Sequence, residues 1–99
     1  MDLLALLAAG NVNDFNDKRT ERTKLDFFAA DLPGLDLADV DLSMANLDKS
    51  DLSGTNLSGA SLYKTSMTGI DGSELNLTGA LGHRLRLKEA WLEDADFTD

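Results

Sequence analysis

The chain has no cysteine, one histidine, one proline and only nine lysines and arginines among its 99 residues. Without cysteine it has no disulfide bridges, thiolate metal sites or cysteine nucleophiles. The longest apolar run, residues 3–9, is too short to span a membrane, and Asp2 precedes it where a signal peptide would have a basic residue. We therefore expect a cytoplasmic protein that does not bind membranes.

Positive charge is scarce, because 18 acidic residues oppose the nine bases and give a net charge of −9. Residues 1–24 hold four acids and four bases, so the whole excess lies in residues 25–99. Such a balance disfavours binding to phosphate backbones and favours basic partners. We expect a basic protein partner and no direct binding to nucleic acid.

A period of five residues runs from residue 25 to the end. Every fifth residue from Phe27 is large and apolar in thirteen of fifteen pentads, the exceptions being Gly72 and Gly82. The residue two positions earlier is never charged, and the residue between these two is Asp, Asn or Ser in twelve pentads. This period matches neither a helix nor a flat strand. It predicts a short extended segment with two inward side chains, followed by a corner.

The fifth position of the pentad is the predicted corner, where tolerance of positive φ is useful. Five glycines fall on it, namely Gly34, Gly54, Gly59, Gly69 and Gly79. The chain is therefore expected to wind.

The pentads ADLPG, LDLAD, VDLSM, ANLDK, SDLSG, TNLSG and ASLYK resemble the A(D/N)Lxx pattern of pentapeptide repeat proteins. The resemblance covers residues 25–99. It implies an all-β solenoid, a right-handed quadrilateral β-helix with four pentads per coil. The fifteen pentads would make about 3.75 coils and a tower about 18 Å tall at the roughly 4.8 Å spacing of strands. At the two glycine centres, either Leu81 rotates inward or a small defect is tolerated.

Residues 1–24 are predicted to form a short α-helical cap on the repeat of residues 25–99, within one structural domain. Residues 2–9 favour a helix that ends at Gly10, and a second helix is expected to begin at an Asn13 cap. A solenoid's first coil has an open edge that must be covered. The available covers are Leu3, Leu4, Leu6, Leu7, Val12 and Phe15.

With four pentads per coil, residues twenty apart stack on one face of the tower. Two adjacent faces then hold ten acids and no base, whereas the other two faces hold four acids and all five bases of the repeat. The candidate acidic interaction face consists of Asp31, Asp51, Asp71, Glu74, Glu93, Asp94, Asp36, Asp39, Asp96 and Asp99.

The leading hypothesis for function is a non-enzymatic structural or interaction module that presents this rigid acidic surface. The alternative is a DNA-mimicking modulator of DNA gyrase or of another DNA-binding protein, because some pentapeptide repeat proteins resemble DNA and protect gyrase. Ten carboxylates over about 18 Å approach the density of one phosphate per about 1.7 Å of duplex. A third interpretation is that the acids only keep a repetitive β edge soluble.

The carboxyl-terminal coil is the second candidate contact region. Trp91 takes an outward position where Asp or Asn is usual, so Trp91, Leu92 and Phe97 are candidate end-contact residues. The alternative is that the indole covers the neighbouring coil. A last coil left open at Asp99 favours self-association through this end, or a chain that is one domain of a longer protein.

Catalytic, cofactor and metal sites are not expected. His83 is predicted to be solvated, and the serines and threonines recur without a base partner. Regularly spaced aspartates are better explained by hydrogen bonds to nearby backbone than by metal binding. Arg84, Arg86 and Lys88 are expected to form salt bridges with Glu89 and Glu93.

Overall fold

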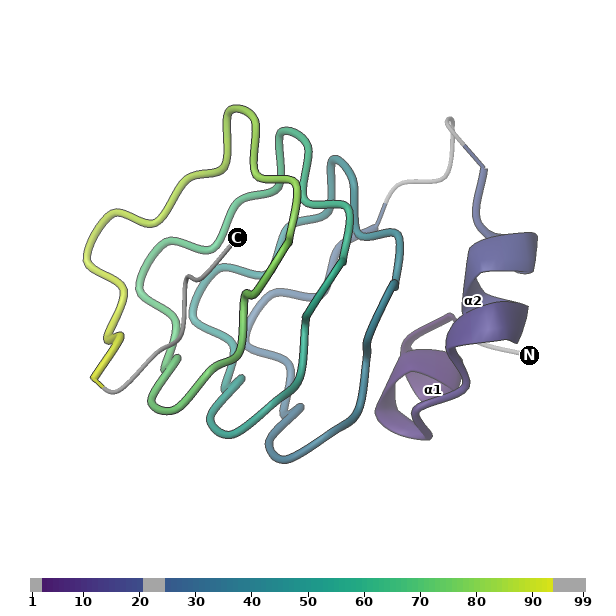
Figure 1. Cartoon of the computed structure of the whole chain (residues 1–99), viewed down its shortest axis with the longest axis horizontal. Coiled ribbons are helices and arrows are strands. Elements are labelled where there is room, and N and C mark those ends of the chain that lie inside the picture. Colours follow the sequence, from purple (N-terminus) through teal and green to yellow (C-terminus); the bar gives the residue numbers. More distant parts are fainter. Residues whose placement is uncertain (1–2, 21–24, 94–99) are drawn as a thin grey trace.

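The computed structural model describes residues 3–20 and 25–93. Two short helices, α1 (Leu3–Ala8) and α2 (Val12–Lys18), lie at one end of a stack of coils (Figure 1). The described part of the chain has no extended strand. Ten isolated parallel β-bridges join the coils, and every one links residues twenty positions apart, from Asp26 with Asn46 to Asp71 with Trp91. The predicted stacking of residues twenty apart is therefore confirmed.

Each pentad combines one bridge with one turn. The Leu37 N–H donates to the Asn56 carbonyl at 2.8 Å, and the Asn56 N–H donates back to the Leu35 carbonyl at 2.8 Å. Within the pentad, the Val40 N–H donates to the Leu37 carbonyl at 3.1 Å and closes a turn. A bridge on each side and a turn at each corner explain why the period is five residues.

The corner residue has positive φ in all thirteen pentads whose corners the structure describes, as predicted from the glycines. Eight of these corners are not glycine; Asp39 has φ 64° and Lys64 has φ 54°. A left-handed conformation costs a non-glycine residue about 1–2 kcal/mol. The inter-coil ladder imposes it nevertheless, because the corner N–H donates to the next coil, as Asp39 does to Ser58 at 2.9 Å.

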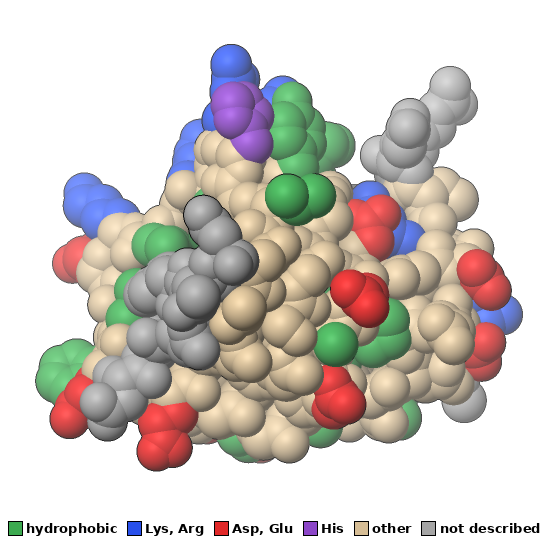
Figure 2. Space-filling model, viewed as in Figure 1, with side chains coloured by type: hydrophobic (Ala, Val, Ile, Leu, Met, Phe, Trp, Pro, Cys, Tyr) green, Lys and Arg blue, Asp and Glu red, His purple; other side chains and the backbone are tan. Residues whose placement is uncertain are grey.

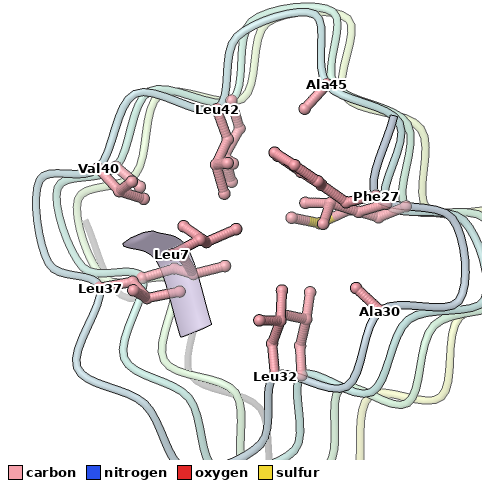
Figure 3. Close-up of a cluster of buried hydrophobic side chains, with 14 of the residues drawn as sticks. Leu7, Phe27, Ala30, Leu32, Leu37, Val40, Leu42 and Ala45 are labelled. Carbon is pink, nitrogen blue, oxygen red and sulfur yellow. The ribbon is translucent and has the colours of Figure 1, made fainter. Parts of the chain in front are cut away.

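The core fills the inside of the coils, and the side chains converge on it from all sides (Figure 3). Leu32, Leu37 and Leu42 are no more than 1% exposed, as are the central leucines of the next coil. The residue two positions earlier is small or apolar and also points inward, as Val40 and Ala45 do. The inward columns predicted from the sequence are therefore the core.

Three buried positions carry hydroxyl groups. Thr65 donates its hydroxyl to the Leu42 carbonyl at 2.7 Å, and Ser50 donates to the Phe27 carbonyl at 2.9 Å. Thr55 bonds the Leu32 carbonyl in the same way. Each hydroxyl bonds a carbonyl 23 residues earlier in the chain, so these polar side chains are satisfied inside the tower.

Neighbouring leucines and an isoleucine occupy the space beside the two glycine centres. A Cβ atom on Gly72 would lie 2.8 Å from Leu92 Cδ2 and 3.3 Å from Ile70 Cδ1, and one on Gly82 would lie 3.2 Å from Leu85 Cδ2. Leu81 is 69% exposed, so the expectation that it rotates inward is wrong. Ile70, Leu85 and Leu92 take that space instead.

The helices cover the first coil. Leu6, Leu7 and Phe15 are buried, and the other three predicted covers, Leu3, Leu4 and Val12, are partly buried against the same core. The Phe15 and Phe27 rings lie 6.1 Å apart between centroids. Gly10 has φ 72°, as its predicted place after the first helix requires.

The cap residue of α2 differs from the prediction. The helix begins at Val12 with Asn11 as its N-cap, and the Asn11 side chain accepts the Asp14 N–H at 3.4 Å. The prediction of Asn13 is therefore wrong. Asn11 also donates to the Asp14 carboxylate at 3.0 Å, so the asparagine two residues earlier satisfies the first turn.

Two polar side chains of the cap bond the edge of the first coil. Asn16 donates to the Asp39 carbonyl at 3.1 Å and accepts the Asp41 N–H at 2.8 Å. Arg19 Nη1 donates to the carbonyls of Asp41 and Ser43, each at 3.0 Å. In the next coil, the carbonyls of Ser61 and Tyr63 correspond to those of Asp41 and Ser43. They accept main-chain N–H groups, from Leu42 and Met44 respectively. The cap thus replaces hydrogen bonds that a preceding coil would make.

Candidate functional site

Asp31, Asp51 and Asp71 form a straight row along the tower, which we call the acidic row. Parallel bridges join Asp31 to Asp51 and Asp51 to Asp71, and the next bridge continues the column to Trp91. Three acids of the candidate interaction face are therefore placed one per coil, as the twenty-residue spacing predicted.

Hydrogen bonds from a serine two residues later hold two of the three carboxylates. Asp51 accepts the Ser53 N–H at 3.0 Å and the Ser53 hydroxyl at 2.6 Å. Asp71 accepts the same two groups of Ser73 at 3.2 and 2.9 Å. At Asp31 the corresponding residue is Pro33, which has no N–H to donate. Asp31 is exposed and, within residues 3–20 and 25–93, makes no hydrogen bond or ion pair.

The hydroxyl of Ser53, followed by its N–H, lowers the pKa of Asp51 below the usual value, against a smaller opposing effect of burial. Hydrogen bonds to a carboxylate favour its charged form. Asp51 is therefore ionised throughout the neutral range and contributes a fixed negative charge at the centre of the row.

Four further acids of the candidate face are exposed around this row. Glu74 and Glu93 belong to the same face, and Asp36 and Asp39 belong to the adjacent one. The described part of the chain holds a single ion pair, Arg19 with Asp41 at 3.1 Å, so none of the seven described acids is neutralised by a base. Asp94, Asp96 and Asp99 lie outside the described residues.

The candidate end-contact residues are placed differently from one another. Trp91 follows Asp71 at the carboxyl-terminal end of the acidic row and is 61% exposed, so its ring does not cover the neighbouring coil. Leu92 is half-buried and fills the space beside Gly72. Phe97 lies outside the described residues, and the contact role of this end and self-association through it stay predictions.

The basic side chains do not form the expected ion pairs. Arg84, Arg86 and Lys88 make no salt bridge with Glu89 or Glu93 in the region that the structure describes, so that expectation is wrong. Instead, Lys64, Arg84 and Arg86 line a shallow groove. Sequence reasoning missed this groove because it assigned these residues to two separate faces, whereas they meet at the corner between those faces.

His83 is exposed as predicted, but it is not surrounded by solvent alone. Its ring stacks on Tyr63 one coil earlier, with centroids 5.7 Å apart and an angle of 6° between the planes. Lys64 Nζ lies 5.2 Å from the Tyr63 centroid. Among the described residues there is no group of three His, Asp or Glu side chains that could hold a metal ion.

Period, bridges and cap together define a capped β-solenoid repeat protein that presents rows of side chains at one-coil intervals. A family model described as "Pentapeptide repeats" matches with 8 copies over residues 25–59 and 36–71. The chain belongs to the pentapeptide repeat family. Members of this family are generally structural or interaction modules and are generally not enzymes.

Two solved structures illustrate the likeness. HetL, a pentapeptide repeat protein involved in heterocyst differentiation regulation from the cyanobacterium Nostoc sp. strain PCC 7120, is 32% identical, with a TM-score of 0.72 over 75% of this chain. This chain spans 35% of HetL. Rfr23 from the cyanobacterium Cyanothece 51142 is 19% identical, with a TM-score of 0.55 over 81% of this chain and 67% of its own.

These neighbours imply a right-handed quadrilateral β-helix. The match to Rfr23 bears on the fold alone.

No curated protein matches the chain. In the described residues, neither helix has the length and apolar character needed to cross a membrane.

Proposed function

We propose that the chain is a cytoplasmic, non-enzymatic interaction module whose acidic row binds a basic protein partner. One observation carries the proposal. Asp31, Asp51 and Asp71 stand on successive coils, and no base pairs with them in the part of the chain that is described.

The rigidity of the row favours binding. Ser53 and Ser73 hold two of the carboxylates in place, so a partner's cation finds an acceptor whose side-chain freedom is already reduced. At the roughly 4.8 Å spacing of neighbouring strands, three carboxylates in a line repel one another. A basic side chain docked between two coils relieves that repulsion. Binding at the row is therefore more favourable than binding at isolated acids.

The alternative, a DNA-mimicking modulator of DNA gyrase or of another DNA-binding protein, would use the same surface. The regular repetition of one acid per coil favours it, but the distance between the acids does not. One acid per coil corresponds to about 4.8 Å along the axis, wider than the phosphate spacing of about 3.4 Å along one DNA strand. The row by itself therefore matches a basic peptide better than a DNA-binding cleft. Gyrase supercoiling assays with the purified protein separate the two functions.

The test is a titration of a labelled peptide of alternating lysine and serine. The triple reversal Asp31→Lys, Asp51→Lys and Asp71→Lys is expected to weaken binding at least about tenfold. The matched control, Asp17→Lys, Asp26→Lys and Glu89→Lys, changes the net charge by the same amount on exposed acids outside the row. It is expected to weaken binding much less. Equal losses in both variants would mean that only total charge matters and would overturn the proposal.

A further inference from the structure

We propose that another corner of the tower carries a second binding site, a groove for an acidic segment of a partner protein. This basic groove is lined by Met44, Ala45, Asn46, Lys64, Ser66, Arg84 and Arg86 and has a volume of about 550 Å³. It shares no residue with the acidic row: the corner of Met44, Lys64 and Arg84 is two pentads away from the row, and the column of Asn46, Ser66 and Arg86 lies on the neighbouring pentad.

The groove runs along the axis of the tower. Met44, Lys64 and Arg84 occupy the same corner of successive coils, and all three have positive φ. Beside this corner, parallel bridges join Asn46 to Ser66 and Ser66 to Arg86. Two parallel columns of side chains, each three coils long, therefore flank an open groove that follows the axis of the tower.

The cations of the groove have no acidic partner in the described structure. Lys64, Arg84 and Arg86 are exposed, no carboxylate lines the groove, and none of the three takes part in the single ion pair. Because like charges on neighbouring coils repel, an anionic ligand is the species that stabilises this arrangement. Arginine also matches the planar carboxylate in a bidentate geometry.

An apolar cluster borders the basic groove. Met44, Tyr63 and Leu81 are 53%, 40% and 69% exposed, and they belong to one face of the tower. Figure 2 shows hydrophobic side chains beside the histidine at the upper edge of the view, on the flank of the coils, with lysines and arginines close by. A ligand that combines acidic residues with a large apolar residue therefore fits this side best.

The net charge of −9 decides between classes of ligand. The molecule is 24 × 21 Å across its shorter axes, whereas exposed charges are screened beyond about 8 Å at physiological ionic strength. A short acidic segment confined to the groove thus feels mainly its three cations. A nucleic acid carries one charge per about 1.7 Å and extends past the groove, and a second copy has a net charge of −9 of its own. Both ligands therefore meet the negative charge of the rest of the molecule, which favours a short acidic segment instead.

The experiment is a polarisation titration of a labelled peptide in which a leucine follows each pair of glutamates. The variant Lys64→Gln with Arg84→Gln is expected to weaken binding at least about tenfold. The control, Lys18→Gln with Lys49→Gln, removes two exposed positive charges elsewhere and is expected to leave affinity unchanged. Near-native thermal unfolding of both variants shows that the groove variant is still folded.

Each other outcome overturns the proposal. Equal losses in the two variants would mean that the peptide responds to net charge alone. Tighter binding of a single-stranded oligonucleotide of the same charge would make the basic groove a nucleic-acid site. Self-association of the unmodified chain that disappears in the Lys64→Gln, Arg84→Gln variant would make the occupant a second copy.

Discussion

The Asn16 side-chain oxygen accepts the Asp41 N–H at 2.8 Å, in the place that a main-chain carbonyl takes one coil higher, where the Ser61 N–H donates to Val40. Arg19 provides the complementary donor for the carbonyls of Asp41 and Ser43. A pair of side chains on the cap therefore ends the ladder of the solenoid on this face. This closure limits pairing of the first coil with other chains.

The first prediction concerns this closure. Arg19→Met keeps the length of a side chain that is 7% exposed but removes the donor to two carbonyls and to the Asp41 carboxylate. Unsatisfied acceptors cost about 1–3 kcal/mol each, so unfolding in urea should show a loss of about 2 kcal/mol. Lys18→Met, at an exposed position of α2, should change stability by about 0.5 kcal/mol or less. Equal effects would show that Arg19 does not anchor the cap.

The second prediction tests the register of the pentads. Leu57 is fully buried and its neighbour Ser58 is half-exposed. Leu57→Asp places an unpaired carboxylate in the core, at a cost of several kcal/mol that is comparable to the stability of a small domain. Ser58→Asp should change stability by about 0.5 kcal/mol or less. Identical melting temperatures for the two variants would contradict the register.

The third prediction concerns the buried hydroxyls. Thr65→Val retains the shape of a fully buried side chain but removes the hydrogen bond to the Leu42 carbonyl. The Leu42 carbonyl keeps its bond from the Ala45 N–H at 3.0 Å, so the expected loss is about 1–2 kcal/mol rather than more. Thr68→Val, at a half-exposed position, should be close to neutral in the same chemical unfolding experiment. A stabilised Thr65→Val variant would show that packing alone governs this column.

The fourth prediction follows from the lowered pKa of Asp51. A folded pKa below the unfolded value of about 3.9 means that this carboxylate stabilises the fold above the unfolded pKa. The contribution is lost as pH falls through the folded pKa. Ser53→Ala should raise the pKa of Asp51 toward its usual value in an NMR titration, whereas Ser58→Ala should leave it unchanged. An unaltered titration of Asp51 in Ser53→Ala would exclude Ser53 as the main cause.

Much of the fold could be predicted because a solenoid repeats its contacts at a fixed interval. The inward position of Leu57 and the stacking of Asp31 under Asp51 both follow from counting residues. The same arithmetic could not reveal Asn16 or Arg19, because each makes its contacts once, and only after the helices have docked. Nor do local preferences predict positive φ at Met44, where the ladder outweighs the left-handed cost.

The basic groove was hidden for a related reason. Arg84 and Arg86 flank Leu85 and fall in different pentads, so sorting by face separates them. Their charges are then added to those of all the acids on each face. In three dimensions they converge at a corner with Lys64. The corner, rather than the face, is the unit in which these charges act.

The most direct test of the two proposed binding surfaces measures six dissociation constants, those of the basic and the acidic peptide for the unmodified chain, the acidic-row reversal and the Lys64→Gln, Arg84→Gln variant. If the two surfaces bind independently, the acidic-row reversal should weaken binding of the basic peptide only. The groove variant should weaken binding of the acidic peptide only. Each affected dissociation constant should rise at least about tenfold relative to the unmodified chain. If affinities instead follow net charge in both variants, whichever side is changed, the claim of two separate binding surfaces is contradicted.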